Sequence, residues 1–422
     1  SDISPLKGLP LKKLNIDSTS VADLTPIKDM KLLSLSASGS KIADLNPIKD
    51  MPLNHLIVCW TRVSDLSPLK GMSLTRLDVG GTQVTDLSPI KDMPVTYLGI
   101  YSTGITDFSA LEGMLISELY LEGLPVTDLS LFARMPLKGL YFINTQVTDL
   151  SPLQGNNLTW IRFTPKNITQ GIEVLRQMRS LEVISTSFSE YGDPPEEFWK
   201  KYDAGEFGRP ASIPPEVMSA AGMTKPLAFE TPGYDQWVKE VSAMSAEKQV
   251  EAVSKKLVEL NPGFDGKVTP TLESGVVTGL QFSSENVADI SPVRALEMLN
   301  MLTCDTRQDR GGLNDLSPLK GMNIVRLSCK FTQVSDLSPL TGMNLTFLNL
   351  HGAKRVADLS PLKGMKLTWL SFGYSAVADI MPLHGMPLLN LYIGGTQVSD
   401  LTPLKGMALT DFWCAGTSIS DF

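Results

Sequence analysis

Hydrophobic and polar positions along the chain repeat about every 21 residues. Residues 74–93 show the unit, L-x-x-L-x-V-x-x-T-x-V-x-D-L-S-P-I-K-D-M. Its aspartate recurs in two series, at Asp2, Asp23, Asp44, Asp65, Asp86, Asp107, Asp128 and Asp149, and then at Asp289, Asp315, Asp336, Asp358, Asp379, Asp400 and Asp421. A fixed period of this length predicts a solenoid, in which each repeat is one coil stacked on its neighbours. The gap between the series predicts two arrays.

Each coil is expected to contain one short strand and one short helical turn. Leu77 and Val79 alternate with polar neighbours, which is typical of a strand with one buried face. In D-L-S-P, Ser88 is expected to cap a helical turn that has Pro89 in its first positions. A coil of this length has room only for a 3₁₀ turn. We expect the hydroxyl of Thr82 to satisfy backbone groups between neighbouring coils.

The breaks in the pattern predict four segments. We expect a first array with a C-terminal cap, a Pro/Gly/Glu-rich linker with a short helix near 195–203, a cap of helix and hairpin, and a second array. These segments cover residues 1–187, 188–233, 234–282 and 283–422. The fold class is therefore an α/β repeat solenoid with a parallel sheet on the concave face of each array and 3₁₀ turns on the convex face.

Outward-facing strand positions vary from coil to coil and are rich in aromatic residues. These positions flank the second Leu and follow the Val, and they hold ten of the 15 Trp and Tyr residues. Exposed Trp, Tyr and Arg are typical of binding hot spots, so we predict a protein-binding surface. The candidate ligand-binding residues are Trp60, Arg76, Tyr97, Tyr101, Tyr120, Tyr141, Trp160, Arg162, Trp369, Tyr374, Tyr392 and Trp413. The alternative is that strands favour aromatic residues, and that rings such as Tyr120 and Tyr141 stack for structural reasons.

Residues that could carry catalysis or bind metal are sparse. The aspartates form a column, whereas calcium needs six to eight oxygens around one point, so we expect them to cap turns instead. The three histidines form no zinc motif, and phosphate-binding and nucleophile motifs do not occur. Asp78 and Glu118 could form a glycosidase carboxylate pair, but nothing singles them out. We expect no enzyme activity, metal or cofactor.

Composition narrows the possible partners. The net charge is −8 and no basic stripe is visible, so a nucleic-acid partner is not expected. No apolar run approaches the ~20 residues of a membrane span, so membrane insertion is not expected. The chain begins and ends within repeats, which predicts a piece of a longer protein, and both the cytoplasm and the cell envelope remain open. Three cysteines, Cys304, Cys329 and Cys414, occupy a buried column, while Cys59 is expected to point outward.

The repeat resembles the short bacterial leucine-rich repeats of internalins, which carry a D-I-S-P-L turn, although Thr stands here where those repeats have an Asn ladder. Three phrases, LSPLKGM (66–72), FTPKNITQGIEVLRQM (163–178) and EEFWKKYDAGEF (196–207), resemble repeat regions of bacterial proteins found alongside serine/threonine protein kinases. The resemblance implies a protein- or peptide-recognition module, as the sensor or docking part of a larger signalling protein.

Two other functions stay open at this stage. The arrays could be structural and self-assembling, with no external ligand, or they could bind carbohydrate by stacking sugars on the same rings. The recognition hypothesis makes one simple prediction. Replacing Tyr97, Tyr120, Tyr141 and Trp160 by alanine should abolish partner binding while changing the melting temperature little.

Overall fold

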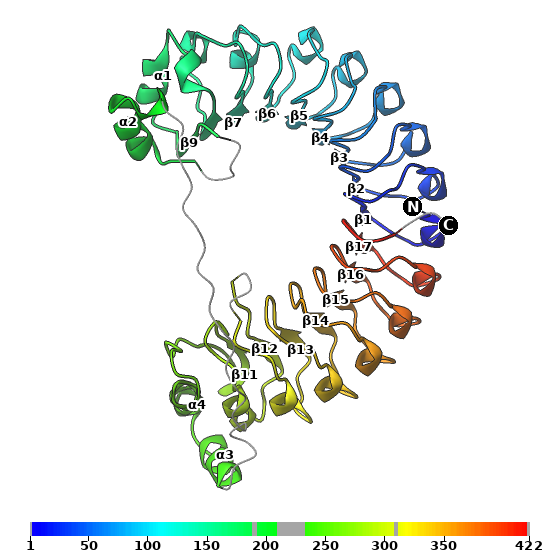
Figure 1. The fold of residues 1–422 in the computed structure, drawn as a ribbon, viewed down its shortest axis with the longest axis vertical. Helices are drawn as coiled ribbons and strands as arrows, with labels where there is room; N and C mark the ends of the chain where they lie inside the picture. The colour runs from blue at the N-terminus through cyan, green and yellow to red at the C-terminus, as the bar shows by residue number, and fades with distance from the viewer. Residues whose placement is uncertain (1, 188–191, 209–232, 308–310, 420–422) are drawn as a thin grey trace. The chain divides into compact units, whose positions relative to one another are not determined.

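A computed structural model describes residues 2–187, 192–208, 233–307 and 311–419 of the chain (Figure 1). The chain forms two compact units. The first unit comprises Lys12–Ser219, and the second comprises Ser1–Leu11 with Ala220–Phe422. The four segments predicted from the sequence do not correspond to these units, and their boundaries remain a prediction. No helix among the described residues is both long and apolar enough to cross a membrane.

The first unit contains a parallel sheet whose described strands pair in chain order (Figure 1). Each strand is three residues long, and the register places Leu next to Leu or Ile on successive coils, for example Leu77 next to Leu98. The strands are β1 (Lys13–Asn15), β2 (Ser34–Ser36), β3 (His55–Ile57), β4 (Arg76–Asp78), β5 (Tyr97–Gly99), β6 (Glu118–Tyr120), β7 (Gly139–Tyr141), β8 (Trp160–Arg162) and β9 (Val183–Ser185).

The predicted 3₁₀ turns are confirmed on the side of each coil opposite the strand. In the first unit they are η2 (Thr25–Ile27), η3 (Asn46–Ile48), η4 (Ser67–Leu69), η5 (Ser88–Ile90), η6 (Ser109–Leu111), η7 (Phe132–Arg134) and η8 (Ser151–Leu153). A further turn, η9 (Pro165–Asn167), directly follows β8 and does not belong to this series. Aliphatic side chains fill the space between turn and sheet. Leu77, Val79, Val84 and Ile90 of one coil are fully buried, so each coil adds one layer to a continuous core.

The aspartate column caps these turns, as expected. The carboxylate of Asp86 accepts hydrogen bonds from the backbone N–H of Ser88 at 2.8 Å and from the Ser88 hydroxyl at 2.8 Å. The prediction that Ser88 provides the cap was therefore wrong, because a carboxylate two residues earlier reaches the free N–H in an Asx turn. In the preceding coil, hydrogen bonds from the hydroxyl and backbone N–H of Ser67 lower the pKa of Asp65.

The threonine column works within a coil and not between coils, contrary to expectation. The buried hydroxyl of Thr82 donates to the carbonyl oxygen of Val79 at 2.6 Å, three residues earlier. Some hydroxyls that do bridge coils lie just before the strands. Those of Thr75 and Thr96 each donate to a backbone carbonyl 21 residues earlier, at 3.1 and 3.2 Å. The threonine column after the strand therefore closes the turn of its own coil.

A helical cap covers the C-terminal end of the first array. It consists of α1 (Ile172–Gln177), β9, α2 (Pro195–Asp203) and η10 (Glu206–Gly208). Phe198 of α2 is fully buried, and its ring packs 6.0 Å from that of Phe163 and 5.1 Å from that of Phe207. These rings cover apolar surface that a further coil would otherwise bury.

The second unit has the same coils of strand and 3₁₀ turn, preceded in the chain by a different cap. The cap contains α3 (Tyr234–Ser242), α4 (Ala246–Leu260) and the predicted hairpin, β10 (Thr269–Glu273) antiparallel to β11 (Val276–Gln281). The parallel strands are β12 (Met301–Thr303), β13 (Arg326–Ser328), β14 (Phe347–Asn349), β15 (Trp369–Ser371), β16 (Asn390–Tyr392) and β17 (Asp411–Trp413). The turns are η1 (Ser4–Leu6), η12 (Ser291–Ala295), η13 (Ser317–Leu319), η14 (Ser338–Leu340), η15 (Ser360–Leu362), η16 (Met381–Leu383) and η17 (Thr402–Leu404).

All four cysteines are buried free thiols. Cys59 was predicted to point outward, but it is only 9% exposed and its thiol lies 3.1 Å from the hydroxyl of Ser38. Burial, and then the charge of Asp78, raise the pKa of Cys59. The expected exposure was wrong because the side chains of Ser38 and Tyr101 contact this thiol.

Candidate binding face

Strands β4 to β8 carry a stack of rings closed at each end by an arginine. We call Arg76, Tyr97, Tyr120, Tyr141 and Arg162 the first ladder. The guanidinium carbon of Arg76 lies 3.6 Å from the ring centroid of Tyr97, and that of Arg162 lies 5.2 Å from the centroid of Tyr141. Centroids of successive rings are 4.9 and 4.0 Å apart. The parallel register places Tyr120 beside Tyr141 on adjacent strands, whereas Tyr97 has Glu118 as its register partner and reaches Tyr120 diagonally.

The rings of the first ladder are not equally exposed. Tyr97 and Tyr120 are half-buried, whereas Tyr141 is only 7% exposed. Gly139 makes room for this packing, since a Cβ at that position would lie 2.8 Å from the ring of Tyr141. The Tyr141 hydroxyl also donates to the carboxylate of Glu118 at 3.2 Å. The first ladder is therefore a rigid surface, and its rings have little freedom to lose when a ligand binds.

Carboxylates beside the first ladder are partly desolvated. Burial raises the pKa of Asp78 and of Glu118, and it raises the pKa of Glu122 to about 7. A carboxylate oxygen of Glu122 lies 3.5 Å from the guanidinium of Arg162, and its other oxygen is buried without a hydrogen-bond partner among the described residues. Burial also raises the pKa of Tyr97 and of Tyr141, so both hydroxyls stay protonated at neutral pH.

Trp60 and Tyr101 meet over a glycine pair in the coil between them. The indole of Trp60 occupies the space where Gly81 would carry a side chain, and the ring of Tyr101 occupies the equivalent space of Gly80. Their ring centroids are 6.0 Å apart with the planes tilted by 55°. We call these four residues the Trp60 notch. Trp60 is 59% exposed, and the glycine pair provides room for both rings.

The second unit has an equivalent stack. We call Arg326, Phe347, Trp369 and Tyr392 the second ladder. The guanidinium carbon of Arg326 lies 4.3 Å from the Phe347 centroid, and centroids of successive rings are 4.2 and 5.2 Å apart. Arg326 and Phe347 are not among the twelve residues predicted from the sequence. The signal was present, since Arg326 and Phe347 occupy the same outward strand position as Arg76 and Tyr97.

The remaining predicted residues lie outside the two ladders. Tyr374 and Trp413 are 60% and 47% exposed, and both lie against the Gly394–Gly395 pair. Trp160 is half-buried on β8, next to Gly139 in the register. The twelve predicted residues therefore divide, within each unit, into ladder residues, residues at a glycine pair, and Trp160.

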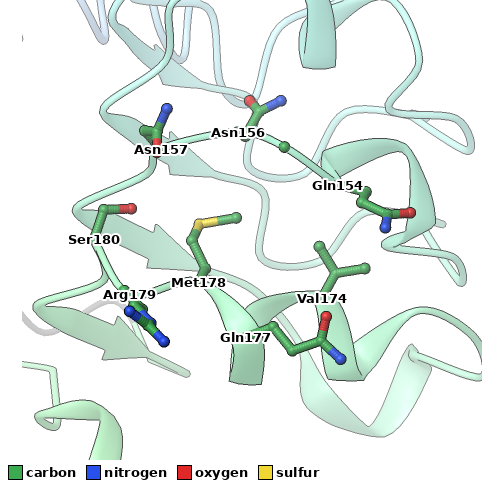
Figure 2. Close-up of a pocket in the computed structure, with 9 residues that line it drawn as sticks. Gln154, Asn156, Asn157, Val174, Gln177, Met178, Arg179 and Ser180 are labelled. Carbon is green, nitrogen blue, oxygen red and sulfur yellow. The ribbon is translucent and has the colours of Figure 1, made fainter.

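A separate cavity of about 360 Å³ lies between the turn after η8 and the α1 segment. Figure 2 shows its lining, Gln154, Asn156, Asn157, Val174, Gln177, Met178, Arg179 and Ser180. Four of the nine lining residues have amide side chains, and the Asn156 amide donates to the carbonyl oxygen of Ala133 at 2.9 Å. None of the residues predicted from the sequence lines it.

No protein-family model matches the chain, and no curated protein matches it. Among solved structures, the chain is similar to an internalin of Listeria monocytogenes, with 16% identity and a TM-score of 0.34 over 97% of this chain and 82% of that one. It is also similar to internalin C2 of the same species (22% identity, TM-score 0.39, 42% and 80% covered) and to a leucine-rich-repeat protein of Leptospira interrogans (12%, 0.29, 98% and 80%). The repeated coil of parallel strand and 3₁₀ turn described above gives this chain a leucine-rich-repeat solenoid fold.

Proposed function

We propose that the chain is a recognition module that binds a protein or peptide on the strand face of its arrays. The first ladder is the observation that carries this proposal. Its three tyrosines and two arginines form one continuous stack, and Tyr, Trp and Arg are the residues most enriched at binding hot spots. Stacking holds the rings in place, so little side-chain entropy is lost on binding.

The dimensions of the face suit a macromolecular ligand. Strands in a sheet lie about 4.8 Å apart, so the strands of the first unit span roughly 38 Å. That length is sufficient for a standard interface of about 800 Å² per partner. A role as the sensor or docking part of a larger signalling protein is part of the proposal, supported by the resemblance of residues 163–178 and 196–207 to sequences found alongside protein kinases.

A displayed library of random twelve-residue peptides tests the proposal. Peptides selected on the intact chain are measured against Tyr120→Ala, against Arg76→Ala, and against Lys91→Ala as a control on the exposed turn after η5. We expect the first two substitutions to weaken binding at least tenfold, as for hot-spot residues, and the control to have no effect. Selected peptides that bind all four proteins equally would refute the proposal.

The same variants distinguish the other two functions. If light scattering shows a defined oligomer that dissociates in Tyr120→Ala, the structural or self-assembling interpretation is favoured instead. If a glycan array shows ladder-dependent binding and the peptide library shows none, the rings bind sugars.

A further inference from the structure

The Trp60 notch combines backbone strain with an exposed indole. Trp60 has a φ of +58°, in the left-handed region that bulky side chains rarely adopt. The coils before and after it have Gly39 and Gly81 at the equivalent position, both also with positive φ. Ser102, Asn144, Phe331 and Tyr374 occupy the same turn position with positive φ, so the repeat imposes this conformation and Trp60 is a bulky residue placed in it. Packing alone does not explain the residue, because more than half of the side chain faces solvent.

Two buried carboxylates lie on or next to the coils of the notch, Asp78 on the coil of the glycine pair and Glu122 on the coil after Tyr101. Among the described residues, Asp78 and Glu122 are the only acidic side chains that are buried, at 7% and 5% exposure. Asp78 accepts a hydrogen bond from the N–H of Gly80 at 3.0 Å, and the Tyr101 hydroxyl is hydrogen-bonded to its carboxylate. Glu122 lies in the next coil, where the N–H of Ser102 donates to its carbonyl oxygen at 2.9 Å. Asp78 and Glu122 therefore flank Tyr101 along the solenoid.

The positive charges nearby do not fully compensate these carboxylates. Arg76 lies over the ring of Tyr97 and Arg162 over that of Tyr141, so both cations lie on the first ladder. Burial raises the pKa of Asp78 more than attraction to Arg76 lowers it. Burial likewise raises the pKa of Glu122 more than attraction to Arg162 lowers it. Buried carboxylates are costly unless they are paired, so the notch is electrostatically suited to a further cation.

We propose that the Trp60 notch binds an arginine or lysine side chain of an extended peptide ligand. The cation lies over the exposed face of the Trp60 indole, with its charge directed toward Asp78. Indole is the strongest aromatic partner for a cation, and a partly desolvated carboxylate adds direct attraction. This proposal rests on the recognition function proposed above and identifies the chemistry of one contact.

Two matched peptides test it. One is a fluorescein-labelled peptide of four Gly-Ser-Arg repeats, and the other carries citrulline, which keeps the shape of arginine without its charge, at each arginine position. Fluorescence polarisation measures the affinity of each peptide. We expect the intact chain to prefer the arginine peptide by about five- to twentyfold. Trp60→Ala and Asp78→Asn should each remove most of this preference.

Two controls separate the notch from the general negative charge of the chain. Glu112→Gln removes one exposed charge on the turn side of a coil, and Leu115→Ala removes an exposed apolar side chain that is 72% accessible. Both should leave the arginine preference unchanged. A preference that survives Trp60→Ala, or that Glu112→Gln reduces as much as Asp78→Asn does, would overturn the proposal. Thermal unfolding of each variant confirms that it is folded.

The failure of this proposal is distinguishable from failure of the recognition function. If library-selected peptides depend on Tyr120 but the arginine and citrulline peptides bind equally, the cation site is wrong and the recognition function stands. If no selected peptide depends on Tyr120, the recognition function itself fails.

Discussion

The rings of Tyr120 and Tyr141 lie parallel, with centroids 4.0 Å apart and planes inclined by only 6°. Aromatic pairs contribute about 0.5–1.5 kcal/mol beyond the area that they bury. A double-mutant cycle with Tyr120→Ala and Tyr141→Ala should therefore give a coupling energy in that range, measured by denaturant unfolding. Strictly additive losses would show that the rings are neighbours without mutual stabilisation.

This contact also changes an expectation drawn from the sequence. Outward-facing positions alone predict that alanine at Tyr141 hardly affects the melting temperature. In the structure Tyr141 is only 7% exposed, so its truncation should lower stability as well as remove a ring from the first ladder. Binding measurements on ladder variants therefore need a stability measurement beside them.

The Gly81 and Trp60 contact leads to a second prediction. Gly81→Ala puts a methyl group 2.2 Å from the Trp60 ring at a residue with a φ of +66°. Gly113→Ala is the matched control, because Gly113 has a φ of +81° and open space around it. The control should lose about 1 kcal/mol of unfolding free energy from backbone strain alone. Gly81→Ala should lose more and should change the near-ultraviolet circular dichroism of the indole.

Equal losses in the two glycine variants would show that the Trp60 ring moves aside without cost. That outcome would weaken the interpretation of the Trp60 notch as a preformed site.

The solenoid could be predicted because its cause is local and repeated. Buried positions equivalent to Leu77 and Val79 recur from coil to coil. Each coil therefore repeats the same sequence signal for a strand, a turn and a core. The capping atom could not be assigned in the same way, since Asp86 and Ser88 both have suitable oxygens and only geometry distinguishes them. Rings also have different roles at different positions. Phe372 lies in the core, whereas Phe347 belongs to the second ladder, so residue type alone does not locate the site.

The aspartate caps should contribute measurably to stability. Asp86→Ala removes the acceptor for the N–H of Ser88 and should cost about 1 kcal/mol, while Asp86→Asn, which keeps one oxygen acceptor, should cost less. Chemical denaturation at neutral pH measures both losses. If the asparagine variant is as unstable as the alanine variant, charge and not the hydrogen bond is the source of the effect.

The four cysteines should be unreactive in the folded chain. The sulfur atoms of Cys304 and Cys329 lie 3.3 Å apart in the buried core, and their contact together with burial raises the pKa of Cys329 well above its usual value. The thiolate is the reactive species, so a thiol-specific chromogenic reagent should label none of them at neutral pH and all four in guanidinium chloride. Rapid labelling of native Cys59 would show that its cover opens.

Glu122 should make stability fall as pH rises toward neutrality. Burial raises its pKa from the usual 4.5 to about 7, with Arg162 opposing the shift and Asp78 adding to it. Between these two pH values the unfolded chain releases the proton while the folded chain keeps it. The contribution of Glu122 to stability is therefore present below about pH 4.5 and is lost as pH rises through about 7. The full loss is on the order of 3 kcal/mol.

Glu122→Gln isolates this effect, because glutamine has nearly the same shape and no titrating proton. The unfolding free energy of the unchanged chain minus that of the variant should decrease between about pH 5 and about pH 8, and stay constant above that. Attraction to Arg162 could instead lower the pKa of Glu122, since the Arg162 guanidinium lies 3.5 Å from the Glu122 carboxylate. If the difference increases with pH, attraction to Arg162 outweighs burial, and Glu122 is a compensated ion pair with no need of a ligand cation.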